Sequence, residues 1–283
     1  MTAALRSWYE ARRWAYPWRG TRDPYQVLVS EVMLQQTQAP RVVPAYRSFL
    51  RRFPTVRSLA AAPRAEVVRA WAGLGYNRRA VALSEAARTI VRDHRGVVPA
   101  DLDALRRLPG IGPYTAAAIA SIAFGKPFAA IDTNVRRVVM RARLGRDIAA
   151  ADEIQRAADR WIDRQDPGSW NQAVMDVGRE HCRPAPRCEA CPLARSCAFR
   201  RSGLTPSAVP RRQPAFQGST RQVRGAIVRR LREGPASLAS LSRTLSSPVE
   251  RVSWAVSALV ADGLVRAGPA ALAGRPEGRV RLG

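Results

Sequence analysis

The sequence predicts an all-α protein with a metal-binding loop and a small C-terminal winged-helix-like domain. Three observations carry this prediction. Apolar residues recur at helical spacing through most of the 283 residues, whereas strand-like alternation is scarce. All four cysteines fall within residues 182–197. Beyond residue 219 the pattern changes to three helices followed by two short strands.

Helical patterns account for most of the first 180 residues. The first predicted helix, residues 24–43, begins at an Asp-Pro start signal and repeats apolar residues at helical spacing. Gly73 and Gly75 separate two further helices, and residues 109–112 separate the next two. In order, the helices predicted after residue 60 span residues 65–72, 77–92, 102–108, 114–124, 133–144, 151–164 and 169–180.

The strong positive charge of the chain indicates a polyanionic partner. Lysine and arginine total 47 against 22 acidic residues, which gives a net charge of +25. An arginine-rich genome explains why 46 of these cations are arginine, but not their excess over acidic residues. Nucleic acid is the partner that such a charge favours. No apolar run is long enough to span a membrane, so we expect no membrane association.

The scarcity of some residue types excludes several kinds of chemistry. Lys126 is the only lysine, so Schiff-base catalysis is left with Lys126 and the amino terminus. Two histidines leave no room for a histidine-rich metal site. No P-loop is present, and residues 110–112 lack the third glycine of a dinucleotide fingerprint. We therefore expect neither ATP-driven nor NAD-dependent reactions.

The cysteines form the clearest metal-binding signal. Their spacing is C-x5-C-x2-C-x5-C, from Cys182 through Cys188 and Cys191 to Cys197. Four cysteines around one C-x-x-C core predict a four-thiolate metal site. The spacing leaves zinc and a [4Fe-4S] cluster open. Two disulfides are the alternative. This alternative is disfavoured because the rest of the chain has the features of an intracellular DNA-binding protein, in which disulfides are rare.

A Leu-Pro-Gly-Ile-Gly segment, residues 108–112, connects two predicted helices. Gly110 and Gly112 let backbone N–H groups converge at the start of the second helix. Such a turn suits one DNA phosphate. An ordinary helix–helix turn with glycine caps is the alternative, and the net charge of the chain favours the phosphate site.

Two acidic residues stand at positions that favour catalysis. Glu31 is the only acid in the apolar run 27–34, where desolvation should raise its pKa and let it act as a general acid. Asp132 precedes a predicted helix, where capping and the helix dipole favour the ionised form. Cleavage of a glycosidic bond needs such a pair. A solvated glutamate and a simple helix cap are the alternatives.

A polar run, Gln35-Gln36-Thr37, follows the apolar segment that holds Glu31. Glutamine side chains can hydrogen-bond to base edges or fill a vacated position in a base stack. The exposed end of a helix is the alternative interpretation.

Together these residues resemble the endonuclease III superfamily of helix-hairpin-helix DNA glycosylases, and within it the adenine DNA glycosylases of the MutY type. The resemblance covers about residues 5–200. It implies a fold of two helical lobes, with a lobe of about residues 22–128 inserted into the lobe formed by the rest of residues 1–200. The segments that carry it are residues 17–19, 30–37, 73–76, 108–115, 131–135 and the four cysteines.

The resemblance implies roles for the acids and their neighbours. Glu31 aligns with the general acid that protonates adenine N7, and Asp132 with the carboxylate that stabilises or traps the sugar cation. Tyr114 and Asn134 match residues that support the intermediate. Bifunctional relatives carry a Schiff-base lysine at the position of Tyr114, so a monofunctional enzyme is implied.

The resemblance also implies the cofactor and the DNA contacts. All four cysteines would hold a [4Fe-4S] cluster that orders a loop presenting arginines to phosphate. The adenine has to be flipped out of the duplex to be cut. Gln35, Gln36 and Tyr76 match residues that wedge into the duplex and contact the opposite base. The complete set of expected DNA-binding residues is Arg19, Gln35, Gln36, Thr37, Tyr76, Gly110 and Gly112.

The C-terminal part departs from the family. Residues 201–219 predict a linker, and residues 220–283 a winged-helix-like domain in place of the family's nucleotide-hydrolase-like domain, which recognises 8-oxoguanine. This domain either contacts DNA through Arg251, Arg279 and Arg281 or packs on the remainder as a spacer. Its predicted helices span residues 221–232, 238–245 and 249–262, and its strands residues 263–266 and 279–282.

The leading hypothesis is a monofunctional adenine DNA glycosylase of base-excision repair that acts opposite 8-oxoguanine or guanine. A thymine or uracil mismatch glycosylase of the same superfamily is the first alternative. A non-catalytic DNA-binding protein on this scaffold is the second. The expected partner is double-stranded DNA with a mismatched or damaged pair. We expect a monomer in the bacterial cytoplasm, associated with the nucleoid through DNA.

Overall fold

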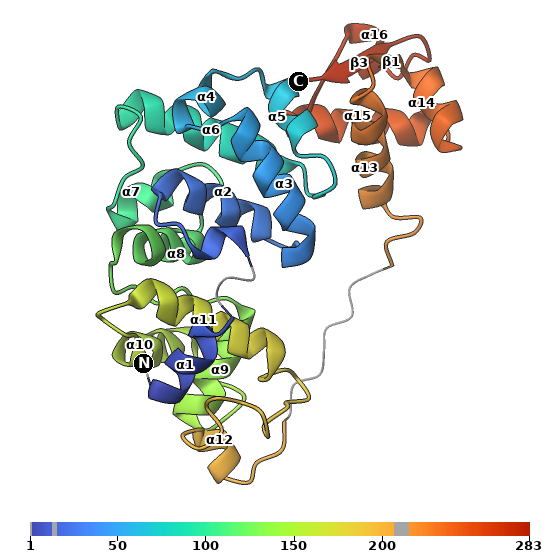
Figure 1. Cartoon of the computed structure of the whole chain (residues 1–283). Helices are drawn as coiled ribbons and strands as arrows, with labels where there is room; N and C mark the ends of the chain where they lie inside the picture. The colour runs from blue at the N-terminus through green and yellow to red at the C-terminus, as the bar shows by residue number, and fades with distance from the viewer. Residues whose placement is uncertain (1, 13–15, 207–214) are drawn as a thin grey trace. The chain divides into compact units, whose positions relative to one another are not determined.

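The computed structural model describes residues 2–12, 16–206 and 215–283. The chain divides into two compact units, one of residues 1–31 and 98–212 and the other of residues 32–97 and 213–283 (Figure 1). The predicted all-α fold is confirmed, because the strands of the described residues are confined to the C-terminal module. No helix in the described ranges is long and apolar enough to cross a membrane.

The first unit is built around α9 and α11. Helix α9 packs on α10, α11 and α12, and α11 packs on α1 and α8 (Figure 1). Apolar side chains of α1, α9, α10 and α11 form one buried cluster that includes Leu5, Val139 and Trp170. The elements of this unit are α1 (Ala3–Glu10), η2 (Pro17–Arg19), the first turns of α2 (Pro24–Leu34), α7 (Leu102–Arg107), α8 (Pro113–Phe124), α9 (Thr133–Leu144), α10 (Ala151–Trp161), α11 (Pro167–Glu180) and α12 (Ala198–Arg201).

Local sequence signals set where several of these helices begin and end. The side chains of Asp101, Asp132 and Asp166 accept hydrogen bonds from backbone N–H groups at the starts of α7, α9 and α11. Gly125 and Gly145 adopt left-handed conformations that end α8 and α9. These caps place Asp132 at a fixed point, the first residue before α9.

The second unit begins with four helices and corrects one sequence prediction. Residues 24–43 are not one helix, because α2 ends at Leu34 and α3 begins at Ala39. Gln36 between them has a left-handed backbone (φ 57°), and Pro40 has no N–H for a continuous helix. Helices α4 and α5 pack on α6. The four helices are α3 (Ala39–Arg52), α4 (Val56–Ala61), α5 (Arg64–Ala70) and α6 (Arg78–Asp93).

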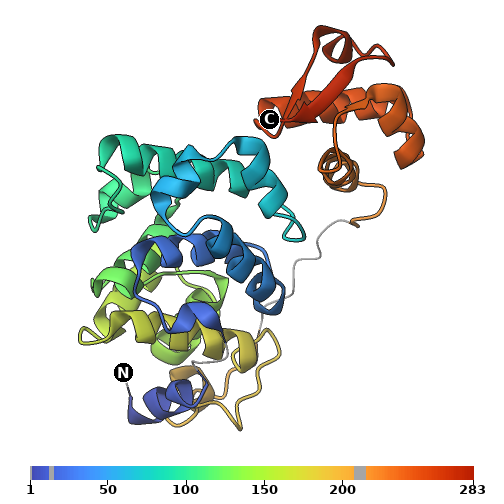
Figure 2. The same ribbon diagram turned by 45° about the horizontal axis from the view of Figure 1, so that its top comes forward.

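The C-terminal module of this unit is winged-helix-like. Three helices pack on an antiparallel sheet of strand order β1-β3-β2, seen in red in Figure 2. The sequence did not indicate β1, which has only two residues, or the short helix α16. The predicted linker, residues 201–219, lies partly outside the described residues. The elements are α13 (Thr220–Leu231), β1 (Ala236–Ser237), α14 (Leu238–Leu245), α15 (Val249–Ala261), β2 (Val265–Ala267), α16 (Pro269–Leu272) and β3 (Arg279–Leu282).

Candidate active site

Glu31 lies on α2 and is buried, with 5% of its surface exposed. Burial raises the pKa of this carboxyl to about 7, against the lowering effects of a hydrogen bond from Tyr114 and the charge of Arg19. The nearby carboxylate of Asp132 raises the pKa further. Glu31 is therefore an acid that holds a proton close to neutral pH, as its apolar sequence surroundings predict.

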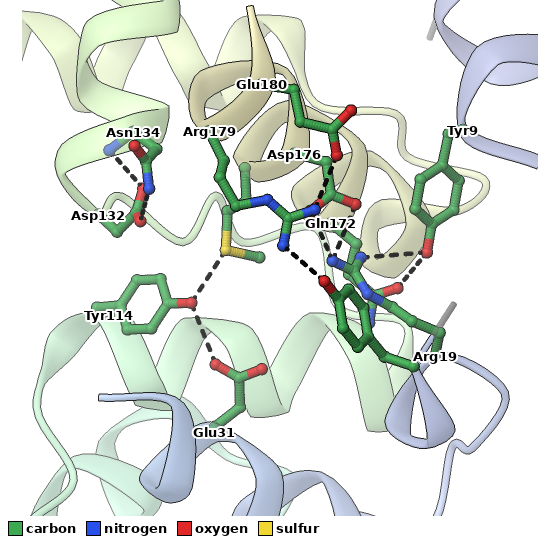
Figure 3. A network of polar contacts seen from close by, with 12 residues as sticks. Tyr9, Arg19, Glu31, Tyr114, Asp132, Asn134, Gln172, Asp176, Arg179 and Glu180 are labelled. Atoms are coloured by element: carbon green, nitrogen blue, oxygen red, sulfur yellow. Dashed lines mark hydrogen bonds and ion pairs between the residues drawn. The ribbon is translucent and has the colours of Figure 1, made fainter. Parts of the chain in front are cut away.

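Tyr114 connects α8 to Glu31. It sits in the first turn of α8, and its hydroxyl donates a hydrogen bond to Glu31 Oε2 at 3.1 Å (Figure 3). The same hydroxyl lies 3.0 Å from Met175 Sδ on α11. Burial raises the pKa of Tyr114 well above its ordinary value, and the neighbouring carboxyls Glu31 and Asp132 raise it further. Tyr114 is therefore a neutral hydrogen-bond donor at physiological pH.

Asp132 faces the same site from the start of α9. Its Oδ1 accepts from the backbone N–H of Asn134 at 2.9 Å and of Val135 at 2.6 Å, and its Oδ2 accepts from Asn134 Nδ2 at 3.0 Å (Figure 3). The sequence led us to expect a pKa shifted toward the ionised form. This expectation was wrong in direction, because burial raises the pKa of Asp132 despite these hydrogen bonds. The three hydrogen bonds oppose that rise, because they stabilise the ionised carboxylate.

The start of α9 is held tightly against α11. Arg137 donates to Asn134 Oδ1 at 2.9 Å and to the Gly178 carbonyl at 2.8 Å, and it also donates to the Cys182 carbonyl. A Cβ atom at Gly178 would stand 2.6 Å from Asn134 Cβ, so only glycine permits this approach. This packing fixes the amide that holds the Asp132 carboxylate.

Arg19, which the sequence assigns to the DNA contacts, is buried in the structure. Its guanidinium is buried and donates to both carboxylate oxygens of Asp176 at 2.9 Å (Figure 3). It also lies 3.4 Å from the hydroxyl of Tyr9, which donates in turn to Gln172. The pair therefore ties η2 to α11, and the charge of Arg19 acts on Glu31 from within the protein.

Two glycines of the 108–112 segment lie at the start of α8, which has no side-chain cap. Gly110 has φ 75°, a conformation that favours glycine, and Gly112 is the residue before α8. No side chain caps this helix start, and a Cβ at Gly112 would meet nothing within 4 Å. Gly110 and Gly112 are both exposed, so an anion can approach this helix start. The geometry is compatible with the predicted phosphate site.

The predicted wedge residues gather around an arginine that the sequence did not single out. Arg79 Nη1 donates to the carbonyls of Val32 and Met33 at the end of α2. Its Nη2 donates to Thr37 Oγ1 at 2.9 Å and to the Gly75 carbonyl at 3.1 Å. Desolvation lowers the pKa of Arg79 to about 10. One side chain thus fastens the polar run 35–37 to the glycine turn 73–76.

Tyr76 and Gln36 occupy unusual backbone positions in these two loops. Tyr76 has φ 45° and is 49% exposed, and the exposed Gln36 has φ 57°. Left-handed conformations are uncommon for residues other than glycine and often occur at functional sites. The Arg79 guanidinium lies 5.6 Å from the centre of the Tyr76 ring, which supports its orientation.

The four cysteines surround one pocket in the first unit. Cys182, Cys188, Cys191 and Cys197 all line it, together with the buried Arg141. Arg141 donates to the backbone carbonyls of the cysteine loop and pairs with Asp147. The cysteines of the described chain are not joined in disulfides. Within the described ranges, no three histidine, cysteine or acidic side chains are already placed as ligands of a metal ion.

Comparisons with known proteins identify the class. The HhH-GPD superfamily, described as base-excision DNA repair proteins, matches residues 29–164. An endonuclease III captured in a covalent intermediate with DNA has 26% identity and a TM-score of 0.60, over 71% of this chain and 95% of that one. A thermostable thymine-DNA glycosylase has 30% identity and a TM-score of 0.64, over 71% and 94%. The fold and the site define a DNA-binding base-excision repair glycosylase of the HhH-GPD superfamily.

The particular family follows from sequence relatives. A protein named adenine DNA glycosylase from Mycobacterium tuberculosis is 43% identical over 270 residues, which cover 92% of this chain and 88% of that protein. The chain belongs to the adenine DNA glycosylases. It is a DNA N-glycosylase of base-excision repair, so the alternative of a non-catalytic DNA-binding protein was wrong.

Proposed function

We propose that this enzyme excises adenine mispaired with 8-oxoguanine or guanine, as a monofunctional glycosylase in which Glu31 is the general acid. The observation that carries the proposal is the buried Glu31, whose pKa is raised to about 7 while Tyr114 donates to its Oε2. A group that retains a proton near neutral pH can protonate a leaving base.

The two carboxyls divide the chemistry between them. Glu31 transfers its proton to N7 of the flipped adenine, and the bond between N9 and the sugar C1′ breaks with its electron pair passing to the base. The sugar is left as an oxocarbenium ion, which the carboxylate of Asp132 stabilises until water adds to C1′ and the proton that the water releases returns to the carboxylate of Glu31. The backbone N–H groups of Asn134 and Val135 hold that carboxylate in place.

The placement of Lys126 supports a monofunctional enzyme. Lyase activity needs an amine at the sugar carbon. Tyr114 lies in the first turn of α8, and Lys126 lies beyond the other end of this 12-residue helix. A helix of that length extends about 18 Å, so Lys126 is remote from the site.

The remaining residues serve DNA recognition. We assign Gln35, Gln36 and Tyr76 to the wedge that contacts the opposite base, Thr37 to the DNA contacts beside it, and Gly110 and Gly112 to a phosphate. Arg79, rather than Arg19, supports this set, because it joins both wedge loops. The protein acts as a monomer on double-stranded DNA.

The four cysteines provide the ligands for a [4Fe-4S] cluster. A pocket between four sulfurs, with the cationic Arg141 at its wall, fits a group of net negative charge. The cluster would order the loop 182–197 and would take no part in breaking the bond. Iron and acid-labile sulfide analysis of the purified chain should give about four of each. Zinc in their place would contradict this assignment.

The substrate is tested by single-turnover cleavage of end-labelled duplexes. Adenine is placed opposite 8-oxoguanine, guanine, cytosine or thymine, and T·G and U·G duplexes are included because a thymine-DNA glycosylase is among the structural relatives. We expect scission of the adenine strand opposite 8-oxoguanine and guanine, and only after alkali treatment. Scission at T·G or U·G instead favours the thymine or uracil alternative. Scission without alkali contradicts the monofunctional mechanism.

A further inference from the structure

The C-terminal winged-helix-like module is fixed to α5 and to the start of α6, on either side of the glycine turn 73–76. Its buried apolar core includes Val68 of α5. Arg78 pairs with Asp262 at 3.2 Å, and Arg232 Nη2 donates to Asn77 Oδ1 at 3.4 Å. Asn77 and Arg78 directly follow the predicted wedge residue at the start of α6. The module is therefore part of the same compact unit as both wedge loops.

Three arginines share the solvent face of the module's sheet. Strands β2 and β3 pair antiparallel, with Arg266 directly opposite Arg281. Arg279 lies two residues before Arg281 on β3 and therefore points to the same face. All three are exposed, whereas the alternate residues Val265, Val280 and Leu282 are buried in the module's core.

This arginine face, defined as Arg266, Arg279 and Arg281, has no counter-charge among the residues that the structure describes. Like charges directly opposite each other in an antiparallel pair are destabilising. No ion pair or hydrogen bond joins these side chains to another described residue. Residues 220–283 hold eleven arginines and four acidic residues, so the module as a whole is basic. The surface is complementary to a polyanion.

We propose that the arginine face binds the sugar–phosphate backbone of the duplex beyond the base pair under repair. The module belongs to the unit that carries the wedge loops, so its arginines add phosphate contacts to those of the same unit. Such contacts raise affinity for DNA and carry no sequence information. Arg251 is not included, because its guanidinium donates to the carbonyl of Gly218. The proposal rests on DNA as the substrate and is independent of which base stands opposite the adenine.

The test uses the full-length chain with Arg266→Gln, Arg279→Gln and Arg281→Gln combined. Binding to an undamaged duplex is measured by fluorescence anisotropy over a series of salt concentrations. Loss of three phosphate contacts should reduce the slope of log affinity against log salt by about 2 to 3. The affinity should fall at least about tenfold at about 0.1 M salt. The single-turnover excision rate at saturating enzyme should be unchanged.

A charge-matched control separates a site from the effect of net charge. Arg156→Gln, Arg160→Gln and Arg164→Gln remove three exposed arginines on or just after α10 in the other unit. This control should keep the wild-type slope, and the variant of the arginine face should unfold at or above the wild-type temperature. The proposal is overturned if the variant of the arginine face keeps the wild-type slope, as expected for a surface that binds an acidic protein. It is equally overturned if the control loses as much affinity.

Discussion

The hydroxyl of Tyr114 donates a hydrogen bond to Oε2 of Glu31 at 3.1 Å. The phenol keeps its own proton, because burial and the adjacent carboxyls raise its pKa well above the ordinary value. The bond opposes the effect of burial on Glu31, whose pKa is raised to about 7. Tyr114 thus orients the carboxyl without competing for the proton that catalysis uses.

Substitution Glu31→Gln should abolish most of the excision activity. Glutamine preserves the shape of the side chain but has no proton to transfer. General acid catalysis contributes roughly 10²- to 10⁴-fold, so the single-turnover rate constant should fall by that factor. The exposed Glu10→Gln serves as the control and should keep the wild-type rate. A Glu31→Gln enzyme with undiminished rate would exclude this residue as the acid.

The same substitution should stabilise the protein at alkaline pH. The pKa of Glu31 is raised from 4.5 to about 7 on folding. The contribution of this group to the free energy of unfolding is therefore fully present below pH 4.5 and is lost as the pH rises through 7. Above pH 7 the buried carboxylate costs the folded state up to about 3 kcal/mol. In urea unfolding, the free energy of unfolding of Glu31→Gln relative to wild type should increase between pH 5 and pH 8 by up to about that amount. An equal difference at all pH values would mean that Glu31 is not desolvated.

Gly178→Ala should disturb the active site through α9. Its Cβ would stand 2.6 Å from Asn134 Cβ and 2.9 Å from the Asn134 carbonyl oxygen, so the residues that hold Asp132 have to move. Small displacements of catalytic groups cost about 10²-fold in rate, and overpacking costs about 1–3 kcal/mol of stability. Gly225→Ala on α13 is the control, because its Cβ meets nothing within 4 Å. That control should be neutral or slightly stabilising; equal rates for both variants would refute the coupling.

Arg79→Lys should loosen both wedge loops. A lysine carries the charge but cannot reach the carbonyls at residues 32, 33 and 75 and Thr37 Oγ1 together. Buried carbonyls left without donors cost about 1–3 kcal/mol. We expect a lower melting temperature and a smaller preference for adenine opposite guanine over adenine opposite thymine. Arg78→Lys, at a mostly exposed arginine whose charge the lysine keeps, should change neither quantity. Wild-type discrimination in Arg79→Lys would show that the loops are held without it.

The sequence predicted the helical fold because burial of apolar side chains on one face imposes a 3.6-residue period, which α6 and α9 display. The sequence did not predict the break between α2 and α3, because Gln36 adopts a left-handed conformation that is uncommon for glutamine. The short helices α4 and α16 span one turn or little more, too few residues to display a period.

Candidate site residues were predictable where a residue type stands out from its immediate sequence neighbours. Glu31 stands out as an acid in an apolar run, and Asp132 as an acid before a helix. Long-range partners were not predictable, because Arg19 meets Asp176 across 157 residues and Arg79 is one of 46 arginines. The pKa direction of Asp132 was missed for the same reason, since burial is a property of the folded chain.

The pH dependence of excision tests the role of Glu31 most directly. The second-order rate constant of excision, which reports on the free enzyme, is measured from pH 5 to pH 9. It should fall about tenfold per pH unit above about 7, where Glu31 loses its proton. In Tyr114→Phe this limb should move to higher pH, because the removed hydrogen bond lowers the pKa of Glu31. A rate constant that is flat from pH 6 to pH 9, or a limb at the same pH in Tyr114→Phe, would contradict the account.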